Sequence, residues 1–124
     1  MTKNSALYSF FASFGLPAYE ENSVYDLEGA PAFPYITFQS MTDTLGNTLS
    51  INASLWYRST SWADCNVKAE EISAAIGYGG KLLSYDGGAI WIKRSTPFAQ
   101  NMGDDADDLI KRKLLTINIE YLSE

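Results

Sequence analysis

The sequence predicts an α+β fold: one antiparallel or mixed β-sheet of about five to six strands, with two helices packed on it. Residues 49–58 and 109–122 alternate apolar and polar side chains, as half-buried strands do. Residues 61–76 repeat apolar side chains at spacings of three and four, which is typical of an amphipathic helix. An Asp-Gly-Gly turn separates two β-rich runs further on. The 124 residues match the length of one domain, so we assign residues 1–124 to a single domain.

The first predicted element is a short helix over residues 3–13. Its apolar side is formed by Leu7, Phe10, Phe11 and Phe14. Gly15 closes this helix, and Pro17 prevents its continuation because proline lacks the backbone N–H. Residues 18–26 are expected to be extended but are weakly specified. Two prolines in residues 28–34 bias their neighbours away from helix, so we expect a loop there.

The next two strands are predicted to pair with each other. Residues 35–39 are rich in β-formers and indicate a strand. Residues 43–47 contain Gly-Asn and indicate a turn, which leads into the long strand at 49–58. Because a short turn joins them, we expect the two strands to run antiparallel.

A capped helix is predicted to follow. Its apolar stripe consists of Cys65, Ala69, Ile72 and Ile76. Ser61 is the expected N-cap, Asp64 lies near the positive end of the helix dipole, and Gly77 stands where a left-handed C-cap residue is favoured. The only cysteine lies on the apolar stripe, so we interpret it as a small buried hydrophobe, and no disulfide can form within the chain.

The C-terminal part is predicted to be a hairpin, a loop and a final strand. Residues 81–85 and 89–94 flank the Asp-Gly-Gly turn, and we expect them to pair. Residues 97–108 are polar with an acidic tip, and we interpret them as a loop or edge excursion. The alternation in residues 109–122 indicates the clearest strand of the chain, with a helical turn expected around 107–112.

Composition excludes several classes of function. The chain has no histidine, which is the usual general base and the commonest metal ligand. Its formal charge of −6, with no basic cluster, argues against gripping nucleic-acid phosphates. With 46% apolar residues the chain is not expected to be disordered. No apolar run approaches the roughly 20 residues needed to span a bilayer, and the short aromatic run near the N-terminus lacks the features of a signal peptide, so we expect a cytoplasmic protein.

Two motifs suggest ligands but fit them poorly. The glycine-rich residues 77–81 follow a helix, whereas a phosphate-binding loop precedes one, so a helix end and tight turn explain them better. The acidic residues 104–108 do not have the spacing of a calcium loop, and a solvated acidic loop is the simpler interpretation. We expect no enzyme, no cofactor and no bound metal.

Two tryptophans lie on strand faces that a simple two-layer fold would leave exposed to solvent. Trp56 falls on the nominally polar face of its strand, and Trp91 stands between two isoleucines, which makes that strand apolar on both faces. Either the first helix covers this second face or another subunit does. The sequence leaves both explanations open.

Taken in order, several short motifs resemble small tail proteins of tailed bacteriophages, in particular the tail-terminator (tail-completion) family and related minor tail and neck components. The resemblance extends from about residue 16 to the end of the chain. It rests on FPYITFQ at 33–39, WY at 56–57, AEEI at 69–72, GAIWI at 88–92, PFAQNM at 97–102 and INIEYL at 117–122.

The resemblance implies a structural phage or prophage protein. Such proteins form a homo-oligomeric ring, usually a hexamer, on the last ring of the tail tube. The ring ends tube polymerisation, joins the tail to the head-completion or connector protein, and lets DNA pass through without specific binding. It implies a location in the virion tail, and in the host cytoplasm during assembly.

The residues expected at a subunit or partner interface include an assembly loop at 97–108. They are Trp56, Trp91, Phe98, Gln100, Met102, Asp104, Asp105, Asp107 and Asp108. Two alternatives stay open: another head–tail joining or minor tail component, or a bacterial small-molecule or peptide-binding domain that uses the sheet and its tryptophans as a platform.

Overall fold

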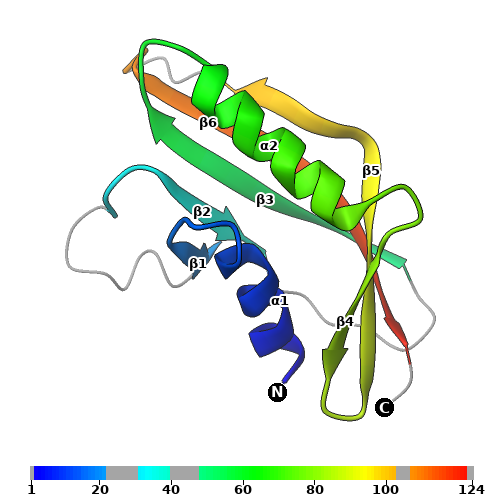
Figure 1. Cartoon of the computed structure of the whole chain (residues 1–124). Coiled ribbons are helices and arrows are strands. Elements are labelled where there is room, and N and C mark those ends of the chain that lie inside the picture. Colours follow the sequence, from blue (N-terminus) through cyan, green and yellow to red (C-terminus); the bar gives the residue numbers. More distant parts are fainter. Residues whose placement is uncertain (1, 22–30, 40–47, 103–106, 123–124) are drawn as a thin grey trace.

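The chain folds around a curled, mixed β-sheet (Figure 1). The computed structural model describes residues 2–21, 31–39, 48–102 and 107–122. Within these residues there are two helices and six strands: α1 Lys3–Ala12, β1 Ala18–Glu20, β2 Tyr35–Phe38, β3 Thr48–Arg58, α2 Ala63–Ile76, β4 Lys81–Tyr85, β5 Gly88–Met102 and β6 Ile110–Leu122. The predicted α+β class is confirmed.

The strands form one sheet in the order β1-β2-β3-β6-β5-β4. β1 is parallel to β2, and all other neighbours are antiparallel, including the predicted pair β2 and β3. The centre of the sheet is the long ladder between β3 and β6, in which Thr48 lies opposite Glu120 and Arg58 opposite Ile110. This ladder aligns the two alternating segments, so that their apolar residues share one face.

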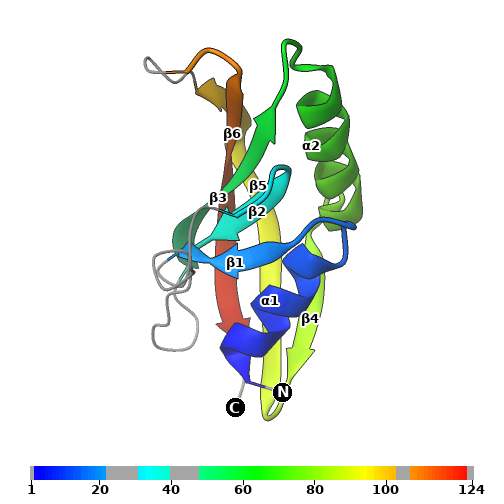
Figure 2. The ribbon, with the colours of Figure 1, turned by 90° about the vertical axis from the view of Figure 1, so that its left-hand side faces the viewer.

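Both helices cover that apolar face (Figure 2). Ile51, Leu55, Ile117 and Ile119 of the central ladder are fully buried there, together with the predicted stripe of α2. Cys65 belongs to this buried stripe, as predicted, and its burial raises the pKa of its thiol. Because α1 lies on the same face as α2, the explanation that the first helix covers Trp56 and Trp91 is wrong.

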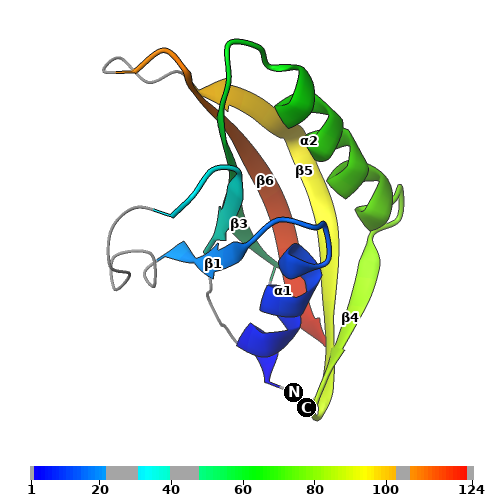
Figure 3. The same ribbon diagram turned by 60° about the vertical axis from the view of Figure 1, so that its left-hand side comes forward.

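Helix α1 spans the concave side of the curled sheet (Figure 3). It contacts β1 and β4, the strands at the two opposite edges of the sheet. Phe11 is fully buried and stacks on Phe38 of β2 with ring centroids 5.0 Å apart. The ammonium group of Lys3, at the other end of the helix, lies 4.7 Å from the ring centroid of Tyr121. The helix therefore connects two edges that do not pair with each other.

Three local predictions are corrected by the structure. Strand β5 continues to Met102, so residues 97–102 are strand rather than loop. The pairing of β5 with β6 shifts between Arg94 and Ala99, and Pro97 falls within this irregular stretch, where a missing N–H breaks no regular ladder. The helical turn expected around 107–112 is a single turn, after which β6 begins at Ile110.

The third correction concerns the start of α2. The helix begins at Ala63 with Trp62 at the N-cap position, and the Ser61 hydroxyl oxygen accepts a hydrogen bond from the Ala63 N–H at 3.0 Å. At the other end, Gly77 closes the helix with φ 80°, although its ψ of 174° lies outside the left-handed helical region. The turn predicted at 43–47 lies outside the described residues. Neither described helix is long and apolar enough to cross a membrane.

Candidate functional site

Both helices lie on one side of the sheet (Figure 2), and we call the opposite face of the sheet the open face. The alternation that buries Ile51 and Leu55 directs Ser54 and Trp56 of β3 to this face. Most of the central positions are hydroxyl or amide residues, as the period of two predicts. At the β2 end, however, aromatic and cationic residues replace them.

Three side chains stack across three neighbouring strands on the open face. Tyr35 of β2 lies opposite Trp56 of β3, and their rings are nearly parallel, with centroids 5.9 Å apart and an interplanar angle of 12°. Arg112 of β6 is the partner of Trp56 on the other side, and its guanidinium lies 4.8 Å from the centre of the indole ring. Cross-strand pairs of this kind combine stacking with a cation–π contact.

Hydrogen bonds hold this stack in place. The Trp56 indole N–H donates to the Thr37 hydroxyl at 2.9 Å, and the Arg112 Nε–H donates to the Ser54 hydroxyl at 3.1 Å. Ser54 is only 3% exposed, so its hydroxyl is a rigid acceptor. Tyr35 is also buried, and this burial raises the pKa of its phenol. The nearby Tyr19 raises the same pKa by a smaller amount. The guanidinium is therefore fixed in orientation by a stacking ring and a buried hydroxyl.

The stack borders a hollow of about 330 Å³, which we call the open-face hollow. Its lining residues are Glu21, Tyr35, Thr37, Gln39, Asn52, Ser54, Trp56 and Arg112. Among the described residues Arg112 forms no ion pair. A fixed guanidinium beside an aromatic wall and amide side chains suits a carboxylate attached to an apolar or planar group. The described residues contain no group of three or more His, Cys, Asp or Glu side chains that could hold a metal ion.

The Ser54 hydroxyl is expected to matter for stability. Ser54→Ala removes the acceptor of the Arg112 Nε–H within a partly buried site, so we expect the free energy of unfolding to fall by about 1–2 kcal/mol. Urea denaturation followed by tryptophan fluorescence measures this loss. Ser50→Ala is the matched control, because Ser50 lies on the same strand and face but is exposed, and its change should stay within about 0.5 kcal/mol. Equal losses in both variants would contradict the role given to Ser54.

The interface residues expected from the sequence do not form one cluster. Trp56 lies in the open-face hollow, whereas Trp91 lies towards the other edge of the sheet, where its indole N–H donates to the Gly79 carbonyl at 3.0 Å. Gln100 and Met102 are exposed opposite Leu114 and Arg112 of β6. Phe98 is partly buried against the core instead.

The acidic residues are also separated by the structure. Asp107 forms an ion pair with Arg58 and accepts a hydrogen bond from the Leu109 N–H at 2.9 Å. Both interactions lower the pKa of Asp107, and the hydrogen bond from the Leu109 backbone has the larger effect. Asp108 is exposed. Asp107 therefore stabilises the turn before β6, while Asp104 and Asp105 lie outside the described residues.

Sequence reasoning missed two of the three stacked residues, Tyr35 and Arg112, and also the hydroxyl of Ser54 that holds Arg112. The sequence predicts Tyr35 only as part of a strand, favours a helical turn at Arg112 and indicates no role for Ser54. The available signal was the polar face of residues 49–58, on which Ser54 and Trp56 are adjacent positions. Only the register with β6 shows that Arg112 lies opposite Trp56.

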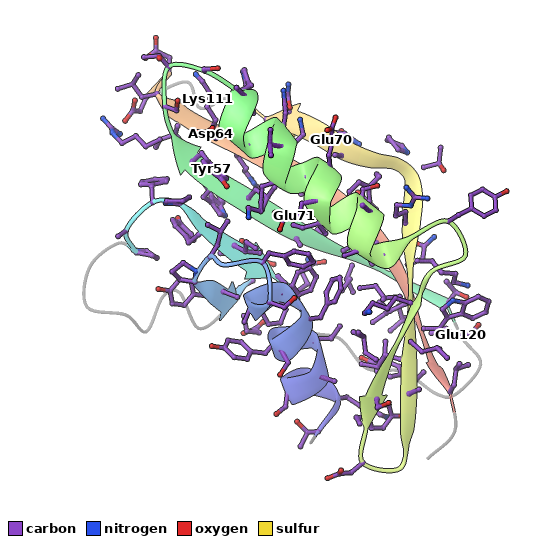
Figure 4. All side chains as sticks on the ribbon, in the orientation of Figure 1. Tyr57, Asp64, Glu70, Glu71, Lys111 and Glu120 are labelled. Atoms are coloured by element: carbon purple, nitrogen blue, oxygen red, sulfur yellow. The ribbon has the colours of Figure 1, made fainter. Side chains whose placement is uncertain are left out.

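A second exposed surface lies on the outer side of α2 (Figure 4). Val67 is 65% exposed there, between the exposed carboxylates of Asp64 and Glu70. The Glu71 carboxylate pairs with the Lys68 ammonium at 2.6 Å. Beneath the helix, burial raises the pKa of Tyr57 to about 12, with smaller contributions from the Cys65 thiol and the carboxylates of Asp64 and Glu71. The outer side of α2 is thus acidic with an apolar centre.

Comparisons of this chain with protein-family models, with curated proteins and with solved structures give no match.

Proposed function

We propose that this chain is a ring-forming structural subunit of a phage or prophage tail, which caps the tail tube, ends its polymerisation and joins the tail to the head connector. The sequence motifs that resemble tail terminators suggest the family. The observation that carries the proposal is the one-sided sheet: both helices cover one face, and the open face keeps a stack of large aromatic and cationic side chains.

A ring requires two different surfaces on each subunit. In a heterologous interface, one patch of a subunit meets a different patch of its neighbour, and repetition closes a ring when the rotation allows it. The open face and the outer side of α2 are such a pair, because they lie on opposite sides of the sheet. The formal charge of −6 suits a ring through which DNA passes without binding.

The test is the mass of the assembly in solution. Light scattering behind size exclusion, over a range of protein concentrations, is expected to give a species of about six subunits, which negative-stain images should show as closed rings. A monomer at every concentration would favour the binding-domain function described below. Mixing with a candidate tail-tube protein would then be the next measurement, since a terminator is expected to bind the end of the tube.

One observation favours a second candidate function. The open-face hollow, with its aromatic wall and fixed guanidinium, also suits a domain that binds a small molecule or peptide bearing a carboxylate. Such a domain would stay monomeric, and its ligand would change the fluorescence of Trp56. The two functions are distinguished by oligomeric state first and by ligand binding second.

A further inference from the structure

The Arg112 guanidinium in the open-face hollow is already oriented to bind an anion. Arg112 is held by Ser54 on one side and by the face of Trp56 on the other, and no described carboxylate pairs with it. Trp56 is itself fixed by Thr37. A guanidinium whose orientation is already fixed loses little conformational freedom when it binds a carboxylate, so the hollow favours such a partner.

The outer side of α2 offers carboxylates in a matching arrangement. Asp64 and Glu70 each stand three residues from Val67, so each carboxylate is a neighbour of the valine on the helix surface, one on either side of it, over about 9 Å of the helix axis. Asp64 and Glu70 form no ion pair with another described residue, in contrast to Glu71, which pairs with Lys68. We call this surface the α2 strip.

The α2 strip cannot reach the hollow of its own chain. Val67, at the centre of the strip, is 65% exposed on the helix-covered side of the sheet (Figure 2), whereas Ser54, Trp56 and Arg112 of the hollow lie on the open face. The sheet and the core lie between them. A contact between these two surfaces must therefore join two copies of the chain.

We propose that, in the assembled ring, the α2 strip of one subunit docks into the open-face hollow of the next, with Val67 against the aromatic stack and a carboxylate of Asp64 or Glu70 on the Arg112 guanidinium. This inference rests on the proposed ring function and names its interface. Carboxylate and guanidinium pair through two parallel hydrogen bonds, which fixes the relative orientation of the subunits. The exposed valine adds apolar contact at the centre of the interface.

Charge reversal on each side tests the interface. Arg112→Glu removes the guanidinium and adds a carboxylate to a hollow that Glu21 already lines, so an acidic strip meets acidic side chains. The double variant Asp64→Lys/Glu70→Lys instead places two ammonium groups against the Arg112 guanidinium. Each variant alone is expected to weaken association by about tenfold or more, because like charges meet at every interface. An equimolar mixture is expected to assemble again, since every contact between the two variants then joins opposite charges. Light scattering and negative stain measure both results.

The controls separate this interface from loss of folding and from a general charge effect. Lys93→Glu changes a charge on the same open face but outside the hollow, and should assemble like the wild type. Circular dichroism and tryptophan emission check that each variant is folded. If Arg112→Glu fails to fold, the α2 double variant decides, because its substitutions lie on an exposed helix surface.

The outcomes distinguish this inference from the proposed function. Rings in the wild type that are lost in each variant and restored in the mixture support it. If Arg112→Glu still forms rings, this interface is wrong but the proposed ring function is not contradicted. The hollow would then be interpreted as a ligand-binding site. A wild type that stays monomeric at every concentration, and in the equimolar mixture of variants, overturns the interface and counts against the ring function as well.

Discussion

Phe11→Ala is expected to lower the free energy of unfolding by about 3–5 kcal/mol, the usual loss when a fully buried phenylalanine is truncated. Phe11 is 0% exposed and stacks on Phe38, with a second edge-on contact to Phe10. Its helix spans two strands at opposite edges of the sheet, β1 and β4. The cavity left by the ring therefore weakens the contact that holds the curled sheet around the core.

Urea denaturation followed by circular dichroism measures this loss. Tyr8→Ala is the matched control, because Tyr8 lies on the same helix and is 49% exposed. Its loss should remain below about 1 kcal/mol, since little buried contact disappears. Equal losses in the two variants would contradict the role given to the packing of Phe11.

Gly80→Ala is expected to cost about 2–4 kcal/mol, from a strained backbone and from steric overlap. Gly80 has φ +89°, which side-chain-bearing residues rarely adopt. A Cβ atom at this position would lie 2.7 Å from the Ile92 carbonyl oxygen and 2.6 Å from the Trp91 indole nitrogen. The carbonyl belongs to the backbone of β5 and cannot move without disturbing the ladder with β4. The glycine thus allows the chain to enter β4 directly beside β5.

Thermal or urea unfolding gives the size of the effect, and the emission of Trp91 reports whether its ring is displaced. Gly79→Ala is the control, because a Cβ at Gly79 has no neighbour within 4 Å and its backbone carbonyl still accepts the Trp91 N–H. We expect a change within about 0.5 kcal/mol for this variant. A Gly80→Ala protein as stable as Gly79→Ala would show that the entry to β4 is not constrained as described.

The elements that were predicted well are those whose signal is local. The stripe from Cys65 to Ile76 predicted α2 and its buried side, and the alternation around Ile51 and Ile117 predicted which residues of β3 and β6 are buried. The Asp-Gly turn predicted the hairpin, in which Tyr85 lies opposite Gly88. In each case the periodicity of the side chains or the turn residues is set by neighbours within a few positions.

The interpretation of residues 97–102 failed because their structure depends on a distant partner. They begin with a proline and show no alternation of apolar and polar residues, so their own pattern favours a loop. They form a strand because β6 is 13 residues long and offers backbone hydrogen-bonding groups along its whole length, from Ala99 opposite Leu115 to Met102 opposite Arg112. The same long strand begins at Ile110 and so limits the helical turn expected over 107–112 to a single turn.

By itself the sequence determined the α+β class, the buried side of most elements, the single buried cysteine and the acidic, histidine-free character of the chain. Only the tertiary structure decided that both helices share one face and that Tyr35, Trp56 and Arg112 form one stack. The physical reason is strand register. Side-chain period specifies the face on which a residue lies, but only the pairing of backbones specifies its neighbour across the sheet.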